Sequence, residues 1–83
     1  MTTSNLKSIT QTIIRGEPAV KFPLRYKWTK VLDANGGMVF DMRGWGRLQY
    51  HPDGEEAAAK FQDSLGRCFV DIINREAKAQ GLY

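Results

Sequence analysis

The chain has 83 residues, a 42% hydrophobic share and an 11% aromatic share, which is enough apolar surface for one small folded core. A single cysteine excludes an internal disulfide framework and a multi-cysteine metal site. The net charge is +3, and no apolar run approaches the ~18 residues of a membrane-spanning helix, so we expect no membrane association. The polar first residues have no signal-peptide pattern. We therefore expect one domain over residues 1–83 in a reducing, cytoplasmic setting.

Residues 3–16 predict a short first helix that begins near Ser4 and ends at Gly16. Threonines and β-branched isoleucines lower the intrinsic helix propensity of this segment, so it depends on docking for stability. The alternative is an arm over residues 1–17 that is frayed or docks separately. The apolar side chains that recur at helical spacing are Leu6, Ile9, Ile13 and Ile14.

A linker over residues 17–23 contains two prolines, and from Phe22 the apolar residues alternate with polar ones, as in a half-buried strand. The inward set of this first strand is Phe22, Leu24, Tyr26 and Trp28. Residues 33–37 (Asp-Ala-Asn-Gly-Gly) form a turn, because Asn-Gly tolerates positive φ. A second strand over residues 38–42 and a short third strand over residues 48–50 follow.

Residues 53–81 predict a long helix with one apolar face and an opposite charged face. We expect Asp53 to cap its start, with Glu56 as the capping-box partner, and Gly81 to follow its last turn. The apolar residues at helical spacing are Ala57, Ala58, Phe61, Leu65, Cys68, Phe69, Ile72 and Ile73.

These elements predict an α+β fold: an N-terminal helix, a three-stranded antiparallel meander and a long C-terminal helix packed on one sheet face. The aromatic sheet face and the apolar helix face each need the other to leave water. The expected core therefore joins two sets of side chains, Phe61, Leu65, Phe69 and Ile72 from the helix, and Tyr26, Trp28 and Phe40 from the sheet.

The stretch over about residues 26–74 resembles a loose class of small bacteriophage and prophage proteins. The shared pattern is a tryptophan-bearing strand, an Asp-x-Asn-Gly turn, a second strand, and a helix that ends in an Ile/Val-rich stretch before Asn. The matching pieces here are Trp28, residues 33–36 (Asp-Ala-Asn-Gly), residues 38–40, and residues 69–74 (Phe-Val-Asp-Ile-Ile-Asn). The resemblance implies a phage accessory protein in a bacterial cytoplasm, and it implies a setting rather than a mechanism.

The residue types needed for catalysis are scarce in this sequence. The single histidine, His51, lies in a His-Pro-Asp-Gly turn, and no second histidine accompanies it to hold a metal. No serine has the sequence context of a nucleophile, and Gly36 and Gly37 precede a strand rather than a helix, unlike a phosphate-binding loop. We expect no enzymatic activity, no metal and no cofactor.

Two stretches are candidates for binding. Residues 43–47 place Trp45 between two glycines, flanked by Arg43 and Arg47, and Trp and Arg are the residues most enriched at interface hot spots. Trp45 either projects toward a partner or folds over the edge of the core, and the sequence leaves both open. The second stretch is a basic stripe on the predicted outer sheet face, formed by Lys21, Arg25, Lys27 and Lys30. Antiparallel sheets normally have one solvated face, so a plain outer surface is the alternative for this stripe.

The excess of positive charge lies in the first 53 residues, which hold eight basic and four acidic side chains. This imbalance is a mild indication of an anionic partner. The function that we expect from the sequence is non-catalytic binding of a host or phage protein, with inhibition as one form of it. The alternative is a small basic accessory protein that binds nucleic acid.

Overall fold

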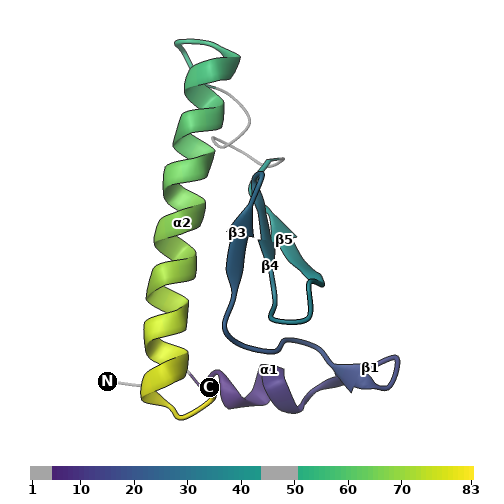
Figure 1. Ribbon diagram of the computed structural model, residues 1–83. Helices are drawn as coiled ribbons and strands as arrows, with labels where there is room; N and C mark the ends of the chain where they lie inside the picture. The colour runs from purple at the N-terminus through teal and green to yellow at the C-terminus, as the bar shows by residue number, and fades with distance from the viewer. Residues whose placement is uncertain (1–4, 44–50) are drawn as a thin grey trace.

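The structure of this protein, a computed structural model, describes residues 5–43 and 51–83 (Figure 1). The predicted α+β class is confirmed: a three-stranded antiparallel sheet lies beside a long C-terminal helix, and a separate two-stranded sheet is formed by residues early in the chain, after the first helix. The elements in chain order are α1 (Lys7–Gln11), β1 (Ile13–Ile14), β2 (Glu17–Pro18), β3 (Arg25–Lys27), β4 (Lys30–Leu32), β5 (Met38–Asp41) and α2 (Glu55–Ala79).

The first helix is much shorter than the sequence predicts. Helix α1 has five residues and ends before Thr12, and β1 and β2 then form a small antiparallel hairpin. Its turn uses Arg15 and Gly16 with φ of 55° and 84°, so the chain reverses where we expected it to continue as a helix. The β-branched residues before this turn favour extended backbone, which explains the difference. The segment is docked, because Leu6 packs against the core and its N–H donates to Gln80 Oε1 at 3.1 Å.

The three-stranded sheet is a meander in the order β3-β4-β5. Its strands differ from the expected ones, because the predicted first strand bends back at Trp28 and Thr29, which have φ of 49° and 65°. Positive φ at both central residues is the geometry of a type I′ hairpin turn, which usually contains Asn or Gly. The expected strand over residues 48–50 lies outside the described residues. The strand that the sequence did not predict is β4, which is the central strand of the observed sheet.

The predicted turn over residues 33–37 is confirmed, and Asp33 organises it from a buried position. One carboxylate oxygen, Oδ1, accepts hydrogen bonds from the N–H groups of Asn35 and Gly37, both at 2.9 Å. The other oxygen accepts the N–H of Lys21 at 3.2 Å. Gly36 has a φ of 85°, which only glycine adopts without strain. The turn therefore ties the segment before β3 to the connection between β4 and β5.

The two ends of α2 differ in how well the sequence predicts them. At the start, the N-cap is Gly54, and no side chain caps the helix, so the expected capping box of Asp53 and Glu56 is wrong. The N–H of Asp53 instead donates to Nδ1 of His51 at 3.1 Å. At the far end Gly81 has a φ of 76°, as predicted for a residue that ends a helix.

The most buried side chains of α2 are small or polar rather than the expected bulky ones, although Val70 and Ile73 pack partly buried against the core. The buried residues of the helix are Ala58, Gln62, Gly66 and Ala77. Phe61, Phe69 and Ile72 are instead 44%, 41% and 50% exposed, so the predicted helix contribution to the core is wrong for these three. The core cluster is built from Val20, Phe22, Leu24, Val31 and Ala77.

The reason for this rotation is a close approach between α2 and β3. A Cβ atom at Gly66 would lie 2.2 Å from Cε2 of Tyr26 and 3.1 Å from Cγ of Met42. No side chain fits in that space, so the helix turns its one glycine toward the ring. The guanidinium of Arg67 lies over the same ring, 5.2 Å from its centre, in a cation–π contact. Burial, and next the charge of the Asp63 carboxylate, raise the pKa of Tyr26.

Helix α2 is also tied to the sheet segment through Asn74. Its side-chain oxygen accepts the N–H of Leu24 at 2.7 Å, and its Nδ2 donates to the carbonyl of Leu24 at 2.9 Å. The side-chain amide of Asn74 thereby satisfies both backbone groups of Leu24, a buried residue. Burying these groups without hydrogen bonds would be costly. This contact fixes the position of the helix along its axis relative to the chain that enters β3.

The contact between Gly66 and Tyr26 predicts that replacing this helical glycine by alanine destabilises the protein. Gly66→Ala should lower the free energy of unfolding by ~1–3 kcal/mol, because the added methyl group overpacks the interface, although alanine favours helix formation. Urea denaturation followed by circular dichroism measures it. Ser64→Ala, at an exposed position of the same helix, is the control and should change stability little. A Gly66→Ala protein as stable as the parent would show that the ring does not approach the helix here.

Candidate binding site at the tip of the β3–β4 hairpin

The most exposed large hydrophobic side chain of the described residues is Trp28, which is 81% exposed. It occupies the first central position of the turn between β3 and β4. The sequence pattern placed Trp28 in the core, and this expectation is wrong. The alternation that holds for Phe22 and Leu24, both buried, ends at the turn, because the chain reverses before Trp28 can complete the inward set.

The backbone of this tip is held in an unfavourable conformation. Both Trp28 and Thr29 have left-handed φ angles, where a side chain with a Cβ costs about 1–2 kcal/mol relative to right-handed backbone. Bulky and β-branched residues are rare there. Such outliers cluster at functional sites, where the surrounding structure over-determines them. An exposed indole at a position better suited to Asn or Gly is therefore a reason to place function at this tip.

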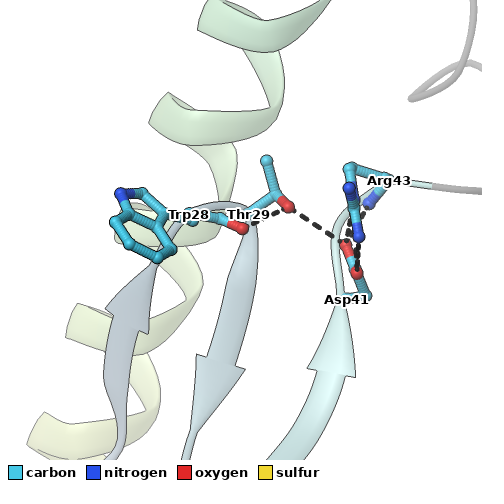
Figure 2. Close-up of polar contacts among 4 residues, drawn as sticks. All are labelled: Trp28, Thr29, Asp41 and Arg43. Atoms are coloured by element: carbon cyan, nitrogen blue, oxygen red, sulfur yellow. Dashed lines mark hydrogen bonds and ion pairs between the residues drawn. The ribbon is translucent and has the colours of Figure 1, made fainter.

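Hydrogen bonds to the neighbouring strand hold the tip in place (Figure 2). The Thr29 hydroxyl lies within hydrogen-bonding distance of the Trp28 carbonyl and, at 3.2 Å, of Oδ1 of Asp41. The carbonyl of Thr29 accepts the N–H of Met42 at 2.7 Å. The turn is thus anchored to the end of β5 and is not a free loop. An anchored aromatic loses little conformational entropy on binding.

Asp41 and Arg43 form the polar side of the tip. The guanidinium of Arg43 donates to both carboxylate oxygens, with Nη2 at 2.9 Å from Oδ2 and Nε at 3.2 Å from Oδ1, and its backbone N–H adds a bond of 2.9 Å to Oδ1. The hydrogen bond from Arg43 lowers the pKa of Asp41 to about 2, and the same pair raises the pKa of Arg43. Figure 2 shows the indole of Trp28 pointing away from this ion pair.

The structure brings three of the four residues of the predicted basic stripe onto one exposed face. Lys27 and Lys30 are directly opposite each other in the β3–β4 ladder, and Arg25 lies two residues before Lys27 and so on the same face. Lys21 is exposed but lies before the sheet. The ammonium of Lys27 lies 5.1 Å from the centre of the Trp28 ring, so the stripe and the indole are continuous. The sequence reasoning missed this junction.

The other predicted binding residues are less well placed by the structure. Arg43 lies beside the tip, in the ion pair with Asp41, so its charge is largely satisfied within the protein. Trp45 and Arg47 lie outside the described residues. The sequence is compatible with a turn at Trp28 and Thr29, because the residues on either side of this pair alternate as strands do. The turn was missed because it contains no Asn or Gly, the residues that usually mark a two-residue hairpin turn.

No group of three His, Cys, Asp or Glu side chains within residues 5–43 and 51–83 is placed to hold a metal ion. In the same part of the chain, no helix is long and apolar enough to cross a membrane. Comparisons with family models, curated proteins and solved structures give no significant match. The geometry of the tip therefore carries the functional argument.

The ion pair at the tip predicts a pH-dependent stability. Because Asp41 has a folded-state pKa of about 2, below its ordinary 3.8, its charge stabilises the fold above about pH 4, and this contribution is lost as the pH falls toward 2. Asp41→Asn should be less stable than the parent at pH 7 and should approach it at pH 2. Urea denaturation at both pH values checks this. A difference that is the same at pH 2 and pH 7 would contradict an ionic origin.

Proposed function

We propose that this protein is a non-catalytic binding protein that engages a protein partner through the tip of the β3–β4 hairpin, with Trp28 as the anchor. The observation that carries this proposal is the exposed indole on left-handed backbone, held by Thr29 and Asp41. Tryptophan anchors buried at the centre of an interface typically cost 2 kcal/mol or more when truncated. In the setting that the phage resemblance implies, the partner is a host or phage protein that is blocked or redirected by the contact.

The surroundings of Trp28 indicate the chemistry of the partner surface. An apolar pocket is needed for the indole, and acidic groups at its rim would face Lys27 and Lys30, which have no acidic partner within salt-bridge distance among the described residues. Rim charges of this kind set the association rate and its salt dependence more than the affinity. Arg43 contributes less, because Asp41 already satisfies it. Trp45 and Arg47 remain proposed contacts on the basis of the sequence.

Binding of single-stranded nucleic acid is the second candidate, and one observation favours it. Arg25, Lys27 and Lys30 share an exposed sheet face that ends at the Trp28 ring. In proteins that bind single strands, exposed aromatic rings stack on the bases and nearby cations neutralise the phosphates. It ranks second because Trp28 is a single stacking platform and the Asp41 carboxylate faces Lys30 across the ladder. A dedicated single-strand binder presents several rings along a longer basic groove.

Substitution of Trp28 tests the proposal through opposite effects on stability and binding. Trp28→Asn should raise the free energy of unfolding by about 1 kcal/mol, because Asn tolerates left-handed backbone, and should abolish partner capture. Affinity capture from a bacterial lysate with mass spectrometry, together with thermal melting, measures both. Met38→Ala, at another exposed apolar position of the sheet, is the control and should retain every specific partner. Proteins captured equally by Trp28→Asn would remove the tip from the binding site.

The nucleic-acid candidate has its own readout. Fluorescence anisotropy with a labelled single-stranded oligonucleotide should show only weak binding at physiological salt if the partner is a protein. A sub-micromolar affinity that falls steeply with salt, and that falls further in Lys27→Ala with Lys30→Ala, would instead favour nucleic acid.

A further inference from the structure

The chain has one Asn-Gly pair, Asn35 and Gly36, and it lies in the turn between β4 and β5. Asparagine is a thermally labile residue in proteins. It loses its side-chain amide when the backbone nitrogen of the next residue attacks its Cγ atom, and a glycine places no side chain in the way of this attack. Both residues of the pair are exposed. Among the asparagines of this chain, Asn35 is therefore the one at which the reaction is chemically easiest.

The fold occupies every backbone N–H of this turn, residues 33–37, with a hydrogen bond. The N–H of Gly36 donates to the carbonyl of Asp33 at 3.0 Å, so the nitrogen that would attack Asn35 has its proton engaged. The Asp33 carboxylate accepts the N–H groups of Asn35 and Gly37, both at 2.9 Å. The two remaining N–H groups donate to main-chain carbonyls, Asp33 to Gly37 at 2.8 Å and Ala34 to Lys21 at 2.7 Å.

Loss of the Asn35 amide requires this turn to open. Ring closure joins the nitrogen of Gly36 to Cγ of Asn35, so that nitrogen must first give up its hydrogen bond to Asp33. The Asp33 carboxylate is buried and also accepts the N–H of Lys21 at 3.2 Å, so opening the turn disturbs the chain before β3 as well. Local openings of this kind cost free energies between zero and that of global unfolding. The folded chain should therefore react only in the fraction of molecules whose turn is open.

We propose that Asn35 is a deamidation site that the Asp33 turn holds in an unreactive state, so that opening of the turn controls its modification. The nitrogen of Gly36 gives up its proton and bonds to Cγ of Asn35, the Cγ–Nδ2 bond breaks, and the amide nitrogen leaves with that proton as ammonia. Water then opens the cyclic imide at either carbonyl, which gives aspartate or isoaspartate. Both products add a negative charge, and isoaspartate also lengthens the main chain by one carbon, so the hydrogen bonds of the turn no longer fit. This inference is independent of the partner proposed for Trp28.

Peptide mass spectrometry after incubation at mildly alkaline pH tests the control by the turn. A gain of about 1 Da at position 35 marks either product. The folded parent should react at least about ten-fold more slowly than the same protein unfolded in guanidinium chloride, because the folded chain reacts only from the open turn. Asn5 and Asn74, which precede leucine and arginine, are internal references and should react slowly in both states. Equal rates at Asn35 in the folded and unfolded protein would overturn the proposal, as would no reaction in either.

A substitution at Asp33 tests the source of the protection. Asp33→Asn keeps the size of the side chain but loses its charge and one acceptor oxygen, so the reaction at Asn35 in the folded protein should be at least about three-fold faster. Asp71→Asn, the same change at an exposed position of α2, is the control and should leave the rate unchanged. Circular dichroism establishes that both variants are folded, and fragment ions separate position 35 from position 33. A folded Asp33→Asn protein that reacts at the parental rate would contradict the proposal, and the comparison of folded with unfolded parent does not depend on this variant.

Discussion

The contact of the Tyr26 ring with Gly66 sets the arrangement of the rest of the molecule. The ring occupies the space in which any side chain at position 66 would lie, so α2 can approach β3 only along the row that contains its one glycine. Helical geometry then decides the remaining faces, since residues three and four positions apart lie on the same side. Ala58, Gln62 and Ala77 follow Gly66 into the interface. Val70 and Ile73 pack partly buried against the core, whereas Phe61, Phe69 and Ile72 are consequently left exposed.

Two exposed apolar surfaces follow from this arrangement and from one turn. Because small side chains make much of the buried contact of α2, Phe61, Phe69 and Ile72 remain exposed. Because β3 and β4 are joined by two residues on left-handed backbone, Trp28 points out of the fold instead of completing the core. Both surfaces consist of apolar groups that the fold could have buried. Asp41 connects the hairpin to the polar side of the tip, since it bonds both Thr29 and Arg43.

Much of the fold was predictable from the sequence, because local signals agree with the structure there. The α+β class, the Asp33 turn, the long helix and its end at Gly81 all depend on local chemistry that the chain shows plainly. The orientation of α2 was not predictable, because apolar spacing marked a bulky face while a single glycine decided the packing. The Trp28 turn was missed for a related reason: no Asn or Gly marks it, so the alternation appeared to continue. The face of α2 and the turn at Trp28 are the places where the local pattern and the tertiary contacts disagree.

Nuclear Overhauser contacts between side chains test the orientation of α2 most directly. The account predicts strong contacts from the ring protons of Tyr26 to the α protons of Gly66, and none from the ring of Phe69 to Tyr26. Selective labelling of glycine and tyrosine makes the measurement feasible in an 83-residue protein. Contacts from the rings of Phe61 and Phe69 to Tyr26 and Phe40, with none to Gly66, would show that the helix buries its bulky face. That result would contradict the packing described here.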